Sequence, residues 1–145
     1  MSFTEAKHLD IEKVPVIDIS KLCDGTDPLP VAKALHKAST GLGFIYIKGH
    51  GIPKDVISSL REEGLTFFRN NEKNKEEVKI TEKHRGWLGY GGAKMEDNAK
   101  ADLKESFLWG YQDKDGTSLN NHPLRGNNVW PSFQPNLEKT SMKYF

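Results

Sequence analysis

The stretch TGLGFIYIKGHGIPKDVISSL, residues 40–60, contains the signals for a helix end, a strand, a turn and a helix start. Gly41 and Gly43 are typical of residues that end a helix. The run at 44–48 is almost continuously apolar, which predicts a strand buried in the centre of a sheet. Pro53 is typical of a helix start. The stretch therefore predicts helices and strands that alternate along the chain.

The turn Gly49-His50-Gly51 inside this stretch has two interpretations. Glycine permits backbone angles that other residues avoid, and a histidine between two glycines can use a ring nitrogen to bond a backbone group of the turn. The histidine could instead bind a metal or take part in catalysis. No second ligand is close in the sequence, so we favour the structural turn.

Hydrophobic periodicity extends the prediction in both directions from this stretch. Apolar residues at helical spacing over 31–42 predict a helix that starts at Pro30. Residues 14–18 predict a short strand with Pro15 at an edge or first position, and the polar residues 1–13 predict a flexible N-terminal arm. A second helix follows Pro53, with an inward stripe of Val56, Ile57, Leu60, Gly64, Phe67 and Phe68.

The second half of the chain is richer in loops. The charged run 70–77 predicts a solvated connection into a short helix that ends near Ile80, and a glycine-rich loop is expected at 84–92. A strand is predicted at 105–111 and a long loop at 113–128. Residues 136–145 predict a helix with Leu137, Ser141, Tyr144 and Phe145 on one face. No stop signal follows it, so we expect the domain to be cut short at its C-terminal end.

The composition narrows the classes of function. The 145 residues are 36% apolar and 28% charged, which fits one globular domain. The net charge of +1, from 21 basic and 20 acidic residues, gives no field that favours nucleic acid or an anionic membrane. The single Cys23 excludes an internal disulfide and a cysteine-based zinc site. The sequence predicts a soluble cytoplasmic protein.

The loop at 84–92 is the strongest candidate for contact with a ligand. His84, Arg85, Trp87 and Tyr90 place cationic and aromatic side chains among four glycines. Such loops often line clefts. The loop lacks the GxxxxGK[ST] pattern of a phosphate loop. For its aromatic residues, a role in packing is as well supported as contact with a substrate.

The triplet His8-Leu9-Asp10 has the HxD spacing of iron(II) sites formed by two histidines and a carboxylate. It lies in a polar arm without a strand pattern, and no third ligand can be identified downstream. We therefore interpret it as a solvated segment. Asp102 and Glu105 are likewise not identifiable as an acid and base pair from the sequence.

Five segments in order resemble one family, the iron(II)- and 2-oxoglutarate-dependent dioxygenases similar to isopenicillin N synthase. The stretch GFIYIKGHGI at 43–52 resembles the family signature GFFYxxNHGI. The opening strand and three later landmarks match in the right order: Val14-Pro15-Val16-Ile17-Asp18, Arg85-Gly86-Trp87, Lys104-Glu105-Ser106-Phe107 and Asn128-Val129-Trp130-Pro131.

The resemblance implies that residues 14–145 are the N-terminal domain of such an enzyme. Its jelly roll, a double-stranded β-helix, would follow the point where this chain stops and would carry the HxD…H iron ligands and the Arg-x-Ser that binds 2-oxoglutarate. The complete enzyme would use iron(II) and 2-oxoglutarate, and we expect neither to bind this chain alone. No residue of the chain is thus assigned to catalysis or to the metal.

The resemblance also implies which side chains meet the substrate and which meet the jelly roll. The mouth of the active site would be bordered by His84, Arg85, Trp87, Tyr90, Ser106 and Phe107. The turn of Gly49, His50 and Gly51 falls within the signature, which supports the structural interpretation. The face towards the jelly roll would include Phe67, Phe68, Trp130, Tyr144 and Phe145.

We therefore predict an α+β domain that is the N-terminal part of a non-haem oxygenase acting on a small molecule. Two alternatives remain open. The chain could be a stand-alone, non-catalytic binding module of the same fold. The parent could also belong to the oxygenases that take no 2-oxoglutarate, because the Arg-x-Ser region is absent.

Overall fold

The computed structural model describes residues 10–92, 102–111 and 126–145. These residues belong to two compact units, which we call unit 1 (Met1–Ile52) and unit 2 (Pro53–Phe145). The sequence predicts one domain over 14–145, but each unit builds an apolar core of its own. Residues 1–9 of the predicted arm, His8 among them, lie outside the described residues.

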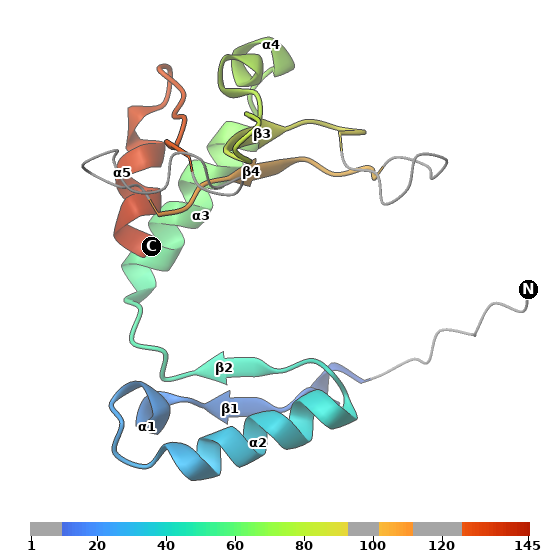
Figure 1. Ribbon diagram of the computed structural model, residues 1–145, viewed down its shortest axis with the longest axis vertical. Helices are drawn as coiled ribbons and strands as arrows, with labels where there is room; N and C mark the ends of the chain where they lie inside the picture. Colours follow the sequence, from blue (N-terminus) through green and yellow to red (C-terminus); the bar gives the residue numbers. More distant parts are fainter. Residues whose placement is uncertain (1–9, 93–101, 112–125) are drawn as a thin grey trace, which may run out of the picture. The chain divides into compact units, whose positions relative to one another are not determined.

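Unit 1 is a two-stranded parallel sheet with a helix packed against it (Figure 1). Ile17 of the first strand is buried together with Val31 and Ala38 of the helix. Parallel strands need a crossover connection, and the helix supplies it. The elements are η1 (Ile11–Lys13), β1 (Val16–Asp18), α1 (Ser20–Cys23), α2 (Pro28–Gly41) and β2 (Tyr46–Lys48).

Strand β2 is exposed, so the prediction of a buried central strand at 44–48 is wrong for this chain. Phe44 is 74% exposed and Tyr46 is 52% exposed. Tyr46 pairs in register with Val16, which is also exposed, so both lie on the same face of the sheet. A continuous apolar run predicts cover on both faces. Within the described residues α2 covers one face, and β2 pairs only with β1.

Helix α2 ends where the glycines of the opening stretch predict. Gly41 is its last residue, and Gly43 has a φ of 81°. The N–H of Gly43 donates to the carbonyl oxygen of Ala38 at 2.9 Å. This bond satisfies one of the carbonyl groups that a helix leaves free at its C-terminus. The predicted end of the helix is confirmed.

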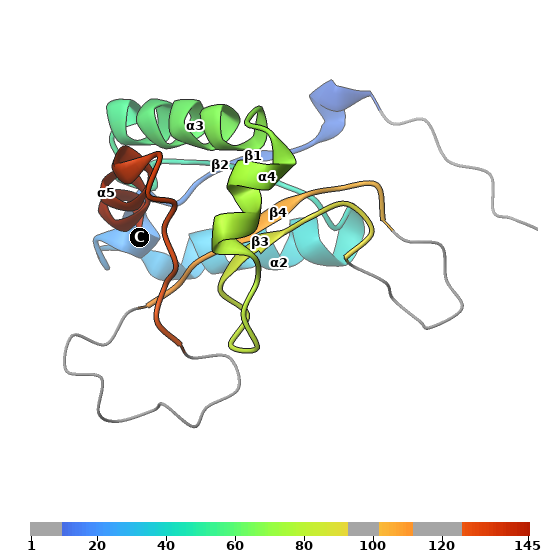
Figure 2. The ribbon, with the colours of Figure 1, turned by 90° about the horizontal axis from the view of Figure 1, so that it is seen from above.

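Unit 2 packs two helices and a hairpin around an aromatic core. Helices α3 and α5 lie side by side (Figures 1 and 2). Phe67 of α3 is fully buried, and its ring meets that of Phe107 edge-on, with centroids 4.9 Å apart. The elements are α3 (Lys54–Phe68), α4 (Glu72–Lys75), η2 (Glu76–Val78), β3 (Gly86–Leu88), β4 (Ser106–Leu108) and α5 (Pro135–Tyr144).

The predicted loop at 84–92 contains a strand. Strand β3 pairs antiparallel with β4, and Trp87 lies opposite Phe107. Gly86 has a φ of 111°, and a Cβ atom there would clash with the carbonyl oxygen of Val78. Glycine is therefore needed for close approach to η2, whereas the sequence pattern indicates a flexible loop. The strand predicted at 105–111 is confirmed over the residues of β4.

The C-terminal helix is confirmed, but its predicted face divides in two. Leu137 and Ser141 are buried against the core of unit 2. Tyr144 is 41% exposed and Phe145 is 63% exposed. Phe67, expected on a face towards a partner domain, lies instead in the core of this chain. The packing of α5 on α3 accounts for both observations, because it covers the first turns of α5 and leaves its end open.

Candidate functional site

His50 closes the turn of unit 1. The N–H of Ile52 donates to Nδ1 of His50 at 3.1 Å. Gly49 and Gly51 have φ values of 71° and 77°, in the region that favours glycine. Nδ1 is therefore occupied by the backbone of the turn, which is the arrangement that the structural interpretation predicts.

A groove of about 620 Å³ in unit 2 is the candidate ligand site. It lies among three segments: the turn before β3, strand β4 with the residues after it, and the end of α5. Its volume is within the range of about 300–1,000 Å³ that is typical of small-molecule sites. The lining residues are His84, Arg85, Phe107, Leu108, Trp109, Tyr144 and Phe145.

A tight turn positions Arg85 at this groove. The N–H of Thr81 donates to the carbonyl oxygen of Arg85 at 2.8 Å, and the N–H of His84 donates to the carbonyl oxygen of Thr81 at 3.0 Å. His84 has a φ of 55° and is the one non-glycine residue with positive φ in the described part of the chain. Such a conformation is costly and persists only when its surroundings enforce it.

The guanidinium of Arg85 is buried, since the residue is only 8% exposed. Nη1 donates to the carbonyl oxygens of His84 at 3.1 Å and Lys83 at 3.4 Å. Nε is buried and has no partner among the described residues. The ion pairs formed within the described ranges do not include Arg85. Among the residues that the structure describes, backbone carbonyl groups alone therefore hold this cation.

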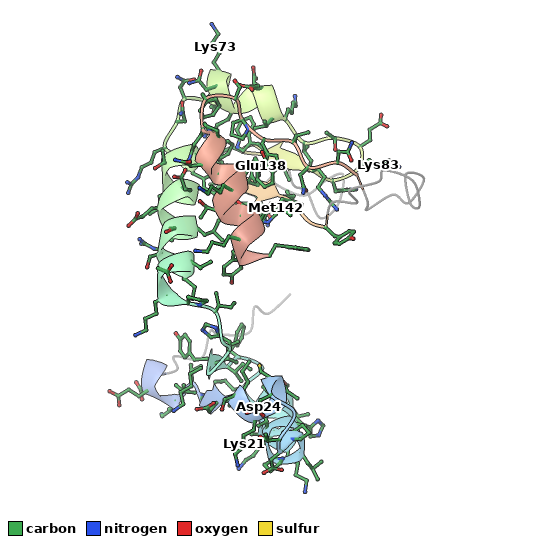
Figure 3. The ribbon with its side chains drawn as sticks, turned by 90° about the vertical axis from the view of Figure 1, so that its left-hand side faces the viewer. Lys21, Asp24, Lys73, Lys83, Glu138 and Met142 are labelled. Atoms are coloured by element: carbon green, nitrogen blue, oxygen red, sulfur yellow. The ribbon has the colours of Figure 1, made fainter. Side chains whose placement is uncertain are left out.

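Asn128 fixes the backbone directly after Trp109, which lines the groove. Its side-chain oxygen accepts from the N–H of Gly110 at 2.9 Å, and its Nδ2 donates to the carbonyl oxygen of Gly110, also at 2.9 Å. The same amide lies 3.8 Å from the sulfur of Met142, which Figure 3 labels on α5. A Cβ atom on Gly110 would lie 2.9 Å from Nη2 of Arg85. The absence of a side chain at Gly110 thus leaves room for the guanidinium.

A second buried cation of unit 2 has a full set of partners. Lys75 Nζ lies 2.5 Å from Glu105 Oε2, and the two side chains are 3% and 9% exposed. Nζ also donates to the carbonyl oxygen of Phe68 at 3.2 Å and lies 5.2 Å from the centre of the Trp87 ring. Trp87 Nε1 donates to the same carboxylate oxygen at 2.7 Å. We call Lys75, Glu105 and Trp87 the buried triad.

The buried triad keeps Glu105 ionised. Burial alone would raise the pKa of this carboxyl, but the hydrogen bonds from Lys75 and Trp87 and the charge of Lys75 together lower it below its ordinary value. A side-chain hydrogen bond from Tyr90 acts in the same direction. An ionised glutamate that accepts bonds from Lys75 and Trp87 stabilises the hairpin.

Only some of the predicted substrate-facing residues lie at the groove. His84, Arg85 and Phe107 meet at the groove. Trp87 is 6% exposed and packs in the core, which favours the packing alternative. Tyr90 is 60% exposed and lies with Trp87 at another hollow, of about 320 Å³.

Ser106 is half-buried and pairs in register with Leu88, so its backbone belongs to the hairpin. The sequence interpretation missed Trp109 as a lining residue. The alternation of side chains along a strand could have indicated it, because Phe107 and Trp109 are two residues apart and share a face. The interpretation also missed Lys75, which lies in a charged run expected to be solvated.

The described residues bring together no group of three His, Cys, Asp or Glu side chains that could hold a metal ion. Among the same residues, every helix is too short or too polar to span a membrane.

Residues 14–133 match the family described as "non-haem dioxygenase in morphine synthesis N-terminal". The chain is 34% identical over 120 residues to 1-aminocyclopropane-1-carboxylate oxidase of Dictyostelium discoideum, which is 81% of this chain and 33% of the relative. It is 28% identical over 148 residues to a homoarginine-6-hydroxylase of Glycine max, with 93% of this chain and 44% of the relative covered.

Solved structures also match most of this chain. A full-length Neurospora crassa protein in complex with alpha-KG and thymine matches 90% of this chain and 41% of its own, with a TM-score of 0.63 and 28% identity. A 2OG-Fe(II) oxygenase family protein of Caulobacter crescentus matches with a TM-score of 0.68 at 20% identity, which supports the fold alone. The chain thus spans between a third and less than half of the length of these relatives.

Proposed function

We propose a function on the basis of the family of this chain. The chain belongs to the non-haem dioxygenase N-terminal family, because it matches that family over residues 14–133. We propose that the whole protein is an iron(II)- and 2-oxoglutarate-dependent oxygenase that oxidises a small molecule. The match to this family over most of the chain is the observation that carries the proposal. The likeness to a protein that was solved with alpha-KG and thymine supports it.

The oxidative chemistry is assigned outside the described residues. These residues contain no cluster that fits a metal ion, so we derive no step of oxygen activation from them. Iron(II) in such an enzyme needs two imidazoles and a carboxylate, with open positions for the co-substrate and for oxygen. We propose that the jelly roll supplies them.

We propose that this chain contributes to substrate binding. The groove presents a buried cation, Arg85, beside the aromatic ring of Phe107. His84 lies in the same groove, and we retain Tyr90, Trp87 and Ser106 as further candidates. Side chains that hold a substrate in one orientation can lower the barrier of a reaction without touching the reacting atoms.

We also propose that the jelly roll covers the exposed apolar side chains of the two units. Unit 1 exposes Val16, Phe44 and Tyr46, and unit 2 exposes Tyr144 and Phe145. Large exposed apolar patches usually mark an interaction surface. We further propose a cytoplasmic location, which agrees with a sequence whose single cysteine leaves no pair for a disulfide.

The product of the complete reading frame that encodes this chain tests the proposal. We expect it to consume oxygen and to convert 2-oxoglutarate to succinate only with iron(II), and to lose both activities when a chelator removes the metal. The 145-residue chain, assayed in parallel, should show neither activity.

Two other outcomes would redirect the proposal. Iron-dependent oxygen consumption without any need for 2-oxoglutarate would indicate the subclass that takes no such co-substrate. A complete product that binds no iron and consumes no oxygen would instead support a stand-alone, non-catalytic binding module.

A further inference from the structure

We infer that the groove of unit 2 binds the carboxylate group of a small organic acid with an apolar body, and that the guanidinium of Arg85 holds this carboxylate. The meaning of the groove as a substrate site depends on the proposed function. The binding of the acid does not, because it requires no turnover and uses only residues of unit 2.

The buried charge of Arg85 has no carboxylate partner among the described residues. Removing a guanidinium from water is expensive unless a carboxylate or a network of hydrogen bonds compensates for the loss. Arg85 is 8% exposed, and no ion pair of the described residues includes it. Two backbone carbonyl groups bond Nη1, but they supply no negative charge. An anionic ligand would complete the site.

The buried hydrogen-bonding groups that have no partner at the groove are donors. Nε of Arg85 is buried without a partner in the described part of the chain, and so is Nε1 of Trp109. Both atoms are donors and cannot accept. Both residues line the same groove. Because both unpaired atoms donate, a ligand that accepts is favoured, and a carboxylate can accept two parallel bonds from one edge of a guanidinium.

The walls of the groove around the guanidinium are mostly apolar. Apart from His84 and Arg85, the groove is lined by aromatic side chains and Leu108. Such walls favour an apolar body on the ligand, because its burial against them removes apolar surface from water. A small dianion is disfavoured, because its second charge would lose water against these walls without a compensating partner.

The backbone directly before Arg85 is held in an unusual conformation. His84, directly before Arg85, is held at a φ of 55° by hydrogen bonds within the turn. Strained residues gather at ligand sites, where the surrounding structure fixes their geometry. The turn therefore presents the guanidinium in a fixed position before the ligand arrives.

The 145-residue chain can be tested directly by NMR titration that follows the indole N–H signals of its three tryptophans. The probes are phenylacetate and phenylacetamide, which share the ring and differ in charge. We expect phenylacetate to bind about tenfold or more tightly than the amide, as charge-assisted hydrogen bonds predict. We also expect 2-oxoglutarate to bind more weakly than phenylacetate.

Two variants assign the effect to Arg85. Arg85→Gln should abolish the preference for phenylacetate over the amide. Gly110→Ala keeps the charge but places a methyl group 2.9 Å from Nη2, so it should weaken phenylacetate binding and leave amide binding nearly unchanged. Arg69→Gln is the matched control, because Arg69 is exposed at the end of α3, and it should bind as the parent chain does. Circular dichroism checks that each variant is folded.

Equal binding of phenylacetate and the amide to the folded parent chain would overturn the inference, since it would mean that the guanidinium needs no ligand. Tighter binding of 2-oxoglutarate than of phenylacetate would overturn the preference for an apolar acid. Neither result would affect the test of the proposed function, which depends on iron-dependent turnover by the complete product.

Discussion

Lys75 and Arg85 are both buried cations of unit 2, at 3% and 8% exposure, and they differ in what surrounds the charge. The ammonium of Lys75 has a carboxylate, a backbone carbonyl and the face of Trp87. The guanidinium of Arg85 has two backbone carbonyls and an open groove. One site is closed by the chain itself, and the other is open to a ligand.

The difference separates a structural charge from a functional one. Lys75 connects α4 to Glu105, directly before β4, through an ion pair between residues far apart in sequence. Removing one partner of such a pair leaves a buried charge behind. Removing Arg85 leaves no described carboxylate unpaired. Loss of the cation should therefore lower stability at the Lys75 site and weaken ligand binding at the Arg85 site.

The largest expected effect is that of Lys75→Met. It leaves the buried carboxylate of Glu105 without its cation, so the free energy of unfolding should fall by about 3–5 kcal/mol. Urea unfolding followed by tryptophan fluorescence measures it, because Trp87, Trp109 and Trp130 all lie in unit 2. Figure 3 labels Lys73, exposed on the same helix, and Lys73→Met should change stability by less than about 0.5 kcal/mol.

The double variant Lys75→Met/Glu105→Leu sharpens this result. It removes both charges, so it should be more stable than Lys75→Met alone. A double variant that is as unstable as the sum of the two single variants would show that the ion pair is not the source of the loss.

Acidification should next distinguish the parent chain from Lys75→Met. The pKa of Glu105 in the folded state is below its ordinary value of 4.5, so its contribution to stability is complete above that value and is lost as the pH falls through the lowered pKa. In Lys75→Met, burial without the cation should raise the pKa of Glu105, and acid should then stabilise this unit relative to neutral pH. Urea unfolding of both proteins between about pH 3 and 7 measures the slopes. Equal slopes would contradict the assignment.

The smallest expected effect is that of Arg85→Met on stability. The variant loses two hydrogen bonds to carbonyl groups but also removes a buried charge without a described carboxylate, so we expect a loss of about 0–2 kcal/mol. The same fluorescence measurement applies. A loss as large as that of Lys75→Met would show that Arg85 has a structural partner and would remove the contrast between the sites.

Several elements could be predicted from the sequence because local signals determine them. Gly43 ends α2 through its positive φ and its hydrogen bond to Ala38. Helical spacing predicted α5, and the strand predicted at 105–111 contains β4. The turn at His50 also depends on neighbours in the sequence, since the bond from Ile52 spans two residues. In each case the deciding interaction is local.

Other features could not be predicted because their partners are distant in the sequence. Lys75 belongs to a charged run that is typical of a solvated segment, yet Glu105, 30 positions later, holds it in the interior. The sequence pattern places Gly86 in a loop, whereas its close approach to Val78 lets β3 form. The exposure of β2 depends on how many neighbours a strand acquires, which an apolar run does not specify.

Motifs and short-range periodicity were enough to indicate the family, the longer helices, the strands β1, β2 and β4, and three residues of the candidate groove. Long-range packing, by contrast, is what buries Trp87 in the core and leaves Arg85 at a groove, although both lie in one short segment. The physical reason is that burial and charge compensation depend on which distant side chains arrive. Glu105 reaches Lys75 and Trp87, and no described carboxylate reaches Arg85.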